Sequence, residues 1–159
     1  AIKKHAIRRP NSVMAAQYSM PYITAATLAY GPKKYSAFES GYHNDPTIIS
    51  LIDKTEAHHD PKLDDYLPDR MANRVTVTFA DGRQESAEVI EALGSPERPL
   101  SFDGVSEKAE PLIDMVDPSM DLGAIADAVR RLPDTSNIDD LMRTLVAGNY
   151  DSTTTLAAE

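Results

Sequence analysis

The sequence contains no cysteine at all, which excludes several kinds of site at once. Without a thiol the chain can form no disulfide framework, no thiolate metal site and no cysteine nucleophile. A cysteine-free sequence fits a reducing compartment. The first ten residues are basic but lack the apolar core of a signal peptide, and no apolar run is long enough to span a bilayer. We therefore predict a cytoplasmic protein with no membrane partner.

Positive charge is also scarce. The 16 lysines and arginines are outnumbered by 25 acidic residues, which gives a formal net charge of -9. Nonspecific nucleic-acid binding depends on neutralising phosphates with Lys and Arg, so this balance predicts no nucleic-acid partner. A local pocket for a small anion stays possible, because a site can be positive on an acidic protein. The simplest interpretation of the charge is a solvated surface.

Short sequence motifs that mark common catalytic, metal-binding or nucleotide-binding sites are missing as well. The sequence has no HExxH, GxSxG, Walker A or GxGxxG pattern. The cluster His58-His59-Asp60 has metal-ligand residue types, but adjacent residues of a strand point to opposite faces, which favours an exposed strand end. Paired carboxylates at 64–65 and 139–140 are typical of a loop and of a helix N-terminus. We predict no metal site and no cofactor.

The length and composition of the chain predict one folded domain. A chain of 159 residues with 42% hydrophobic residues is long enough and apolar enough to bury a core. Neither an internal repeat nor a linker divides it. We therefore predict a single domain over residues 1–148, followed by a polar, disordered tail over 149–159.

The first third of that domain is predicted to be helical. Residues 11–31 are rich in Ala, Met, Tyr and Leu, carry almost no charge and end at Gly31-Pro32, which predicts a helix covered on all sides. Pro21 removes a backbone hydrogen bond, so a kink or a fresh helix start is expected there. Asp45-Pro46 opens a second, short helix through Ile52. Residues 55–60 are read as a polar edge strand.

A hairpin is the clearest feature of the middle. Residues 74–79 alternate apolar and polar side chains, Asp81-Gly82 is a strong turn signal, and residues 84–93 can return as the partner strand. The predicted fold class is therefore α+β, with a small antiparallel sheet, the hairpin from Val75 to Val89, packed against helices.

The last third returns to helical periodicity after a rigid connector at 94–101 that contains two prolines. Apolar residues at 112, 113 and 116 predict one short helix, and those from Leu122 to Val129 a second. Those from Ile138 to Leu145 predict a third, with Ser136 and Asp139 spaced as a capping box.

One segment combines hydroxyl groups with an apolar, kinked setting, namely residues 17–22, Gln-Tyr-Ser-Met-Pro-Tyr. Two interpretations stay open. Buried tyrosines with satisfied hydroxyls would make it an ordinary core helix. Alternatively, a kink frees backbone groups that can meet a ligand.

The order of motifs resembles a known family. Arg9-Pro10 is followed by AAQYSMPYITAATLAYG, by the Asp45-Pro46 helix, by VTVTFADGR and by GSPERPLS. This order, over roughly residues 8 to 145, resembles the C-terminal domain of the MmgE/PrpD family. The chain departs from the family pattern at Tyr18, where phenylalanine is usual, and around Lys108, where a Lys-Phe pair normally opens a longer helix.

The resemblance implies a function. Members of the family include 2-methylcitrate dehydratase, cis-aconitate decarboxylase and iminodisuccinate epimerase, which act on small polycarboxylates without a metal or an organic cofactor. Their chemistry is proton abstraction next to a carboxylate, which needs a positioned base and groups that stabilise the enolate charge. A large helical N-terminal domain supplies most of the active-site Asp, His and Lys residues, and the smaller α+β domain covers the site as a lid.

The resemblance also implies roles for particular residues. Tyr18 or Tyr22 would assist proton transfer as catalytic residues, and four residues would bind substrate, namely Arg8, Arg9, Gln17 and Ser19. The chain is then a lid domain, as a fragment or subunit, that is inactive without its helical partner. The alternative is a stand-alone binding or regulatory module with the same fold. An uncovered apolar helix over 11–31 would favour a homo-oligomer.

Overall fold

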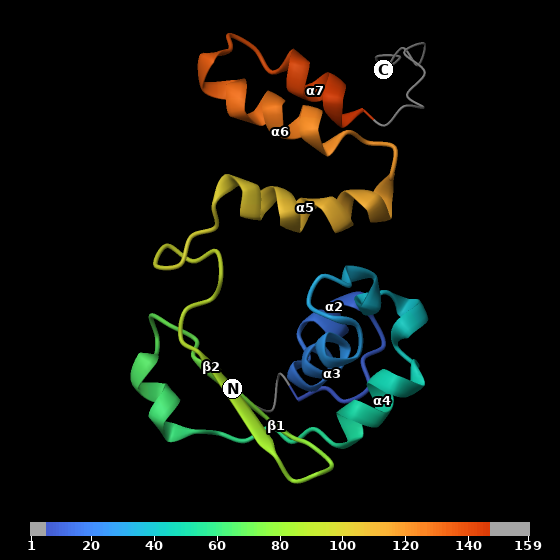
Figure 1. Ribbon diagram of the computed structural model, residues 1–159, viewed down its shortest axis with the longest axis vertical. Helices are drawn as coiled ribbons and strands as arrows, with labels where there is room; N and C mark the ends of the chain where they lie inside the picture. Colours follow the sequence, from blue (N-terminus) through green and yellow to red (C-terminus); the bar gives the residue numbers. More distant parts are fainter. Residues whose placement is uncertain (1–5, 147–159) are drawn as a thin grey trace, which may run out of the picture.

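The computed structural model describes residues 6–146 and confirms an α+β fold. Three parts follow one another along the chain (Figure 1). Helices α2, α3 and α4 gather into one cluster, a two-stranded hairpin lies beside it, and α5 separates the cluster from α6 and α7. Among residues 6–146, no helix has both the length and the apolar character needed to cross a membrane.

The predicted helix over 11–31 is two helices, α2 (Val13–Gln17) and α3 (Met20–Tyr30). The fresh start expected at Pro21 is confirmed. Ser19 is the N-cap of α3 and Pro21 lies in its first turn, where a missing N–H costs nothing. Gly31 ends α3 with φ of 86°, a conformation that favours glycine.

The main core lies where α3 packs on α4 (Pro46–Asp53). Two short 3-10 helices, η1 (Tyr35–Phe38) and η2 (Ser40–Tyr42), close over it. The core consists of small and medium side chains around one tyrosine, namely Ala16, Tyr22, Ala25, Ala26, Ala37, Ile48 and Ile52. The prediction that residues 11–31 are covered on all sides is wrong within the described residues, since Met14, Tyr18 and Leu28 are more than half exposed.

The prediction of an edge strand over residues 55–60 is also wrong. These residues have no regular secondary structure and lead into η3 (Pro61–Tyr66). Asp60 accepts a hydrogen bond from the Lys62 N–H and so caps η3, and Pro61 favours a turn over a ladder. His58 and His59 each pair with a nearby carboxylate, on Glu56 and Asp64, at 3.1 and 2.8 Å.

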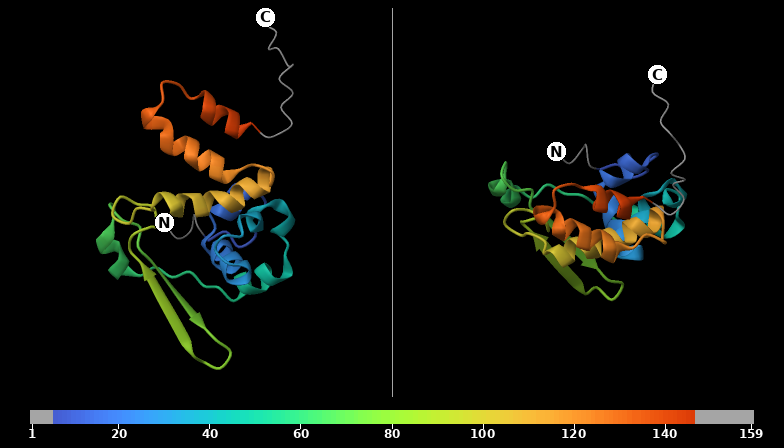
Figure 2. Two further views of the ribbon diagram at one scale, coloured as in Figure 1. Left: turned by 45° about the horizontal axis from the view of Figure 1, so that its top comes forward. Right: turned by 90° about the horizontal axis from the view of Figure 1, so that it is seen from above.

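The predicted hairpin is confirmed as β1 (Asn73–Thr78) and β2 (Gln84–Val89). Val75 lies opposite Ala87, and Gly82 turns the chain with φ of 85°. The hairpin is not packed against helices in the part of the chain that the structure describes. Its side chains are exposed apart from half-buried Val77, and it projects away from the helices (Figure 2). Alternation of apolar and polar residues identifies a strand but does not indicate which element packs on its apolar face.

The C-terminal part stacks α5 (Phe102–Val116), α6 (Leu122–Arg131) and α7 (Asp139–Leu145), with η4 (Leu132–Asp134) between the last two. Helix α5 is longer than predicted: Ser101 caps it, and Phe102 and Val105 extend toward the N-terminus the helical spacing that was expected only from Leu112. The predicted capping box is wrong, since Asn137 and not Ser136 accepts the Asp139 N–H. The predicted tail, 149–159, lies outside the described residues.

Candidate functional site

The junction between α2 and α3 carries the residues that the sequence singled out. Tyr18 is the C-cap of α2, and its side chain is 57% exposed. Gln17, the last residue of α2, is also exposed. Met14 and Met20 are exposed beside them in sequence, at 63% and 40%. The junction therefore presents one phenol and one amide on a surface that is otherwise apolar.

Ser19 lies beneath this surface and is fully buried. Its Oγ accepts a hydrogen bond from the Tyr22 N–H at 3.0 Å and donates one to the Ile7 carbonyl oxygen. The first bond caps α3, and the second fastens the N-terminal segment to the junction. Both capacities of the hydroxyl are used within the domain, so Ser19 positions the junction and does not reach its surface.

Tyr22, the second predicted catalytic residue, is the centre of the core and has no exposed surface. Its hydroxyl donates to the Ala37 carbonyl oxygen at 2.8 Å. The rings of Phe38 and His43 pack on it with centroids 5.9 and 6.0 Å away. Burial, with a smaller contribution from Asp45, raises the pKa of Tyr22, so its hydroxyl stays a neutral donor.

The two arginines lie between the N-terminal segment and the end of α4. The Arg8 guanidinium donates to the carbonyl oxygens of Ile52 and Thr55 at 2.5 and 2.8 Å. A cation that binds the last carbonyls of a helix also offsets its dipole. Arg9 pairs with Asp53 at 2.8 Å and remains 51% exposed. Arg8 is thus committed to α4, whereas Arg9 presents charge to solvent.

The predicted set therefore separates into two groups. Arg8, Arg9, Gln17 and Tyr18 are exposed, whereas Ser19 and Tyr22 belong to the interior. The Ser19–Ile7 bond brings the segment with the arginines to the junction. No group of His, Asp or Glu suited to a metal ion occurs among residues 6–146. What the described residues offer is hydrogen bonding and one positive charge.

Sequence reasoning missed a pair that joins the C-terminal end of α3 to the start of α4. The Tyr30 hydroxyl donates to Asp45 Oδ2 at 2.8 Å, while Oδ1 of the same carboxylate accepts the N–H groups of Thr47 and Ile48. The Ile48 N–H and then the Tyr30 hydroxyl hold the pKa of Asp45 below its ordinary value. The dipeptide Asp45-Pro46 predicts the start of α4. No local pattern indicates that Asp45 also binds Tyr30, 15 residues earlier in the sequence.

Two shallow depressions lie elsewhere on the domain. One, of about 210 Å³, is lined by residues 33–36, which lead from α3 into η1, and by Pro111, Asp114 and Met115 of α5. The other, of about 480 Å³, lies between α5 and α6, and its lining includes three carboxylates and Arg130. Neither includes a residue of the α2–α3 junction.

Comparison with known proteins gives one positive result. A family model described as the MmgE/PrpD C-terminal domain matches residues 1–133. The match covers the junction, α4, the hairpin, α5 and α6, and it ends before α7. No curated protein matched the chain.

Proposed function

Because the chain belongs to the MmgE/PrpD family through its C-terminal domain, we propose that it is the lid domain, as a fragment or subunit, of an enzyme acting on small polycarboxylates. The proposed reaction class is proton abstraction next to a carboxylate, as in a dehydratase, a decarboxylase or an epimerase. One observation carries this proposal: the break between α2 and α3 holds Gln17 and Tyr18 at the surface, on elements fixed from beneath.

The fixed support matters because catalytic groups must be held close to their productive geometry. Tyr18 follows the last turn of α2, and the next residue, Ser19, is anchored by two hydrogen bonds. A phenol held in this way can donate a hydrogen bond to a substrate carboxylate or to the enolate oxygen as charge develops. The neighbouring Gln17 amide can bind a second carboxylate oxygen.

The exposed Arg9 guanidinium beside the end of α4 is the positive charge that we assign to binding an anionic substrate. Arg9 is half exposed and shares its guanidinium with a single carboxylate, Asp53. Both terminal nitrogens of Arg9 already donate, to the Arg8 carbonyl oxygen and to Asp53, and the remaining N–H groups of the guanidinium can donate to a substrate carboxylate. Arg8, Ser19 and Tyr22 are assigned a supporting role, since each bonds to the backbone of the domain itself.

The proposal includes a partner. The described residues offer hydrogen-bond donors at the junction and the Arg9 guanidinium beside the end of α4, and proton abstraction also needs a positioned base. We assign that base to a helical N-terminal domain of the same enzyme, which would cover the exposed Met14 and Met20. The isolated chain is then inactive, and no metal or organic cofactor takes part. The cysteine-free sequence supports a cytoplasmic location.

A stand-alone binding or regulatory module is the second candidate. It is favoured by one observation: two of the four hydroxyl and amide residues of the junction, Ser19 and Tyr22, serve the packing of the domain. Thermal-shift titration separates the candidates. A lid domain should be stabilised by a polycarboxylate such as citrate, whereas a pure interaction module should respond only to a protein partner. No response to any polycarboxylate, alone or with a helical family domain added, would contradict the enzyme proposal.

A further inference from the structure

The stretch that contains η3 and the hairpin has few ties to the helices before and after it. Every hydrogen bond and ion pair of the described residues 61–91 has its partner within residues 59–98. None of residues 61–91 is buried, and Val75, Phe79 and Val89 on the apolar face of the hairpin are each more than a third exposed (Figure 2). Few buried contacts and exposed backbone hydrogen bonds are features of a part of a protein that moves relative to the rest.

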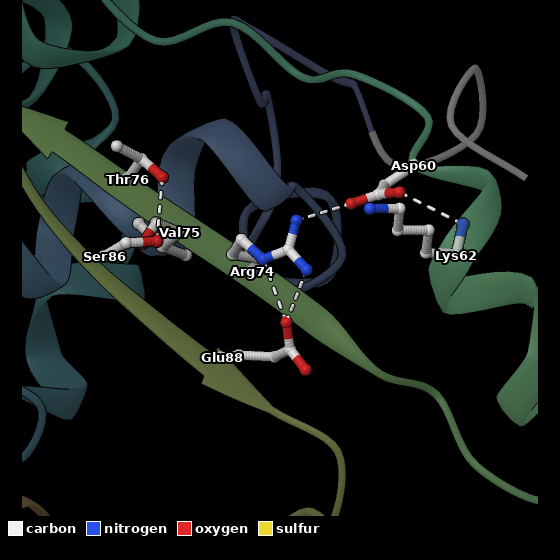
Figure 3. A network of polar contacts seen from close by, with 7 residues as sticks. All are labelled: Asp60, Lys62, Arg74, Val75, Thr76, Ser86 and Glu88. Atoms are coloured by element: carbon white, nitrogen blue, oxygen red, sulfur yellow. Dashed lines mark hydrogen bonds and ion pairs between the residues drawn. The ribbon is translucent and has the colours of Figure 1, made fainter.

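Arg74 joins η3 to the hairpin. Its guanidinium donates from Nε and Nη2 to the Glu88 carboxylate on the neighbouring strand, at 2.9 and 2.6 Å, and from Nη1 to Asp60 Oδ2 at 2.6 Å (Figure 3). The other oxygen of Asp60 accepts the Lys62 N–H at 3.1 Å and so caps η3. Asp60 therefore binds η3 through one carboxylate oxygen and β1 through the other.

A second bridge lies at the same end of the hairpin. Arg70 Nε is 2.5 Å from Glu91 Oε1, but this contact is an ion pair without hydrogen-bond geometry. Isolated exposed ion pairs contribute little to stability, whereas a guanidinium that bonds to two carboxylates at once contributes more. A two-stranded hairpin alone is only marginally stable in water. We therefore expect Arg74 to be the main link that holds the hairpin and η3 together.

The chain enters and leaves this stretch at the base of the hairpin. Residues 55–59, which lead from α4 to η3, have no regular secondary structure. Beyond β2 the chain turns at Gly94, whose φ of 94° favours glycine. The pair of Arg74 and Glu88 lies near the open end of the hairpin, away from the turn at Gly82. Hinges are a few loop residues that absorb changes in φ and ψ, and both connections have this character.

We infer that residues 60–91, which we call the arm, swing as one body about two hinges, at 55–59 and 92–94, and that Arg74 keeps η3 and the hairpin together as they move. The turn at Gly82 lies farthest from the hinges and should therefore undergo the largest displacement. This motion belongs to the chain by itself and does not depend on the proposed enzyme activity.

Two pairs of spin labels on the full chain measure the motion. The sequence contains no cysteine, so labels attach only where a cysteine is introduced. Ala80→Cys with Asp65→Cys places both labels in the arm, at the hairpin turn and on η3, and Ala80→Cys with Thr27→Cys joins the arm to α3. All three positions are exposed. Pulsed electron paramagnetic resonance should give a narrow distance distribution within the arm and one about twice as broad or more from the arm to α3.

Matched variants test the role of Arg74. Arg74→Gln should broaden the distribution within the arm, whereas Arg83→Gln, which removes an ion pair with Glu85 near the turn, should leave it unchanged. Asp60→Asn provides a second test if Arg74→Gln unfolds the hairpin, because asparagine still caps η3 but lacks the charge that Arg74 binds. A wild-type distribution from the arm to α3 as narrow as the one within the arm overturns the hinge motion. Equal widths within the arm for Arg74→Gln and Arg83→Gln overturn the role of Arg74.

Discussion

The Tyr22 hydroxyl donates a hydrogen bond to the Ala37 carbonyl oxygen at 2.8 Å and thereby joins α3 to η1 at the centre of the core. Tyr18 lies only four residues before Tyr22, yet its side chain is exposed at the surface. The two tyrosines that the sequence offered as equivalent catalytic candidates thus occupy opposite environments. The lid-domain account assigns substrate contact to Tyr18 and structural support to Tyr22, and this division can be tested residue by residue.

Tyr22→Phe should destabilise the domain. The substitution keeps the ring packing but leaves the buried Ala37 carbonyl oxygen without its donor, so the free energy of unfolding should fall by about 1–2 kcal/mol. Urea unfolding followed by circular dichroism measures the change. Tyr18→Phe is the matched control and should change stability by less than about 0.5 kcal/mol, because surface substitutions usually do little. Equal losses in both variants would contradict the division.

Ser19→Ala should also destabilise the domain, because it removes the α3 cap together with the bond to the Ile7 carbonyl oxygen. The expected loss is about 2 kcal/mol, at the upper end of measured cap effects. Ser12→Ala removes the exposed cap of α2, whose Oγ accepts only the Ala15 N–H, and should cost about half as much. If both serines cost the same, the anchoring role of Ser19 is wrong.

The Asp45 carboxyl should make the free energy of unfolding depend on pH. The N–H of Ile48 and the Tyr30 hydroxyl lower the pKa of this carboxyl in the folded chain, so the folded state favours the charged form. Its stabilising contribution is complete above the ordinary value of 3.8 and is lost as the pH falls through the lower, folded pKa. Asp45→Asn keeps a good N-cap but cannot titrate.

The measurement is the free energy of unfolding between neutral pH and about pH 2. The wild-type chain should lose more stability than Asp45→Asn over the acidic part of this range. The Asp53→Asn variant alters an exposed carboxylate at the other end of α4 and serves as a comparison. Parallel curves for the wild type and Asp45→Asn would show that the Tyr30–Asp45 bond has no role in stability.

At the proposed site, Tyr18→Phe should lower turnover by an enzyme completed with a helical domain. Loss of a positioned proton donor typically costs about 10²-fold or more. Tyr66, a half-buried tyrosine of η3, provides the control, since Tyr66→Phe should leave turnover unchanged. Full activity of Tyr18→Phe would place proton transfer entirely on the helical domain.

Local signals explain which parts of the fold could be predicted. The hairpin follows from alternation and an Asp-Gly turn, and the start of α4 follows from Asp45-Pro46, because each signal lies within a few residues of the element it sets. The start of α5 was missed although Phe102, Val105 and Leu112 are spaced for one helical face, because Gly104 and Pro111 within the same stretch are typical helix breakers. The strand expected at 55–60 failed because pairing needs a neighbour, which a local pattern does not supply.

For the candidate site, too, the sequence identified the segment but not the role of each side chain. Residues 17–22 were identified from their composition, but the separation of Tyr18 from Tyr22 depends on Ala37, and the role of Arg8 depends on Ile52 and Thr55. These partners lie 15 to 47 residues away in sequence. Distant contacts leave no trace in spacing, so one sequence could name the segment and could not assign its side chains.

The most direct test of the lid-domain account is turnover of 2-methylcitrate, cis-aconitate and iminodisuccinate by the chain alone and by the chain mixed with a helical MmgE/PrpD domain. The account predicts no turnover by the chain alone and measurable turnover of one of these substrates by the mixture, reduced by Tyr18→Phe and unaffected by Tyr66→Phe. Robust turnover by the isolated chain, or a mixture no more active than its helical domain alone, would contradict it.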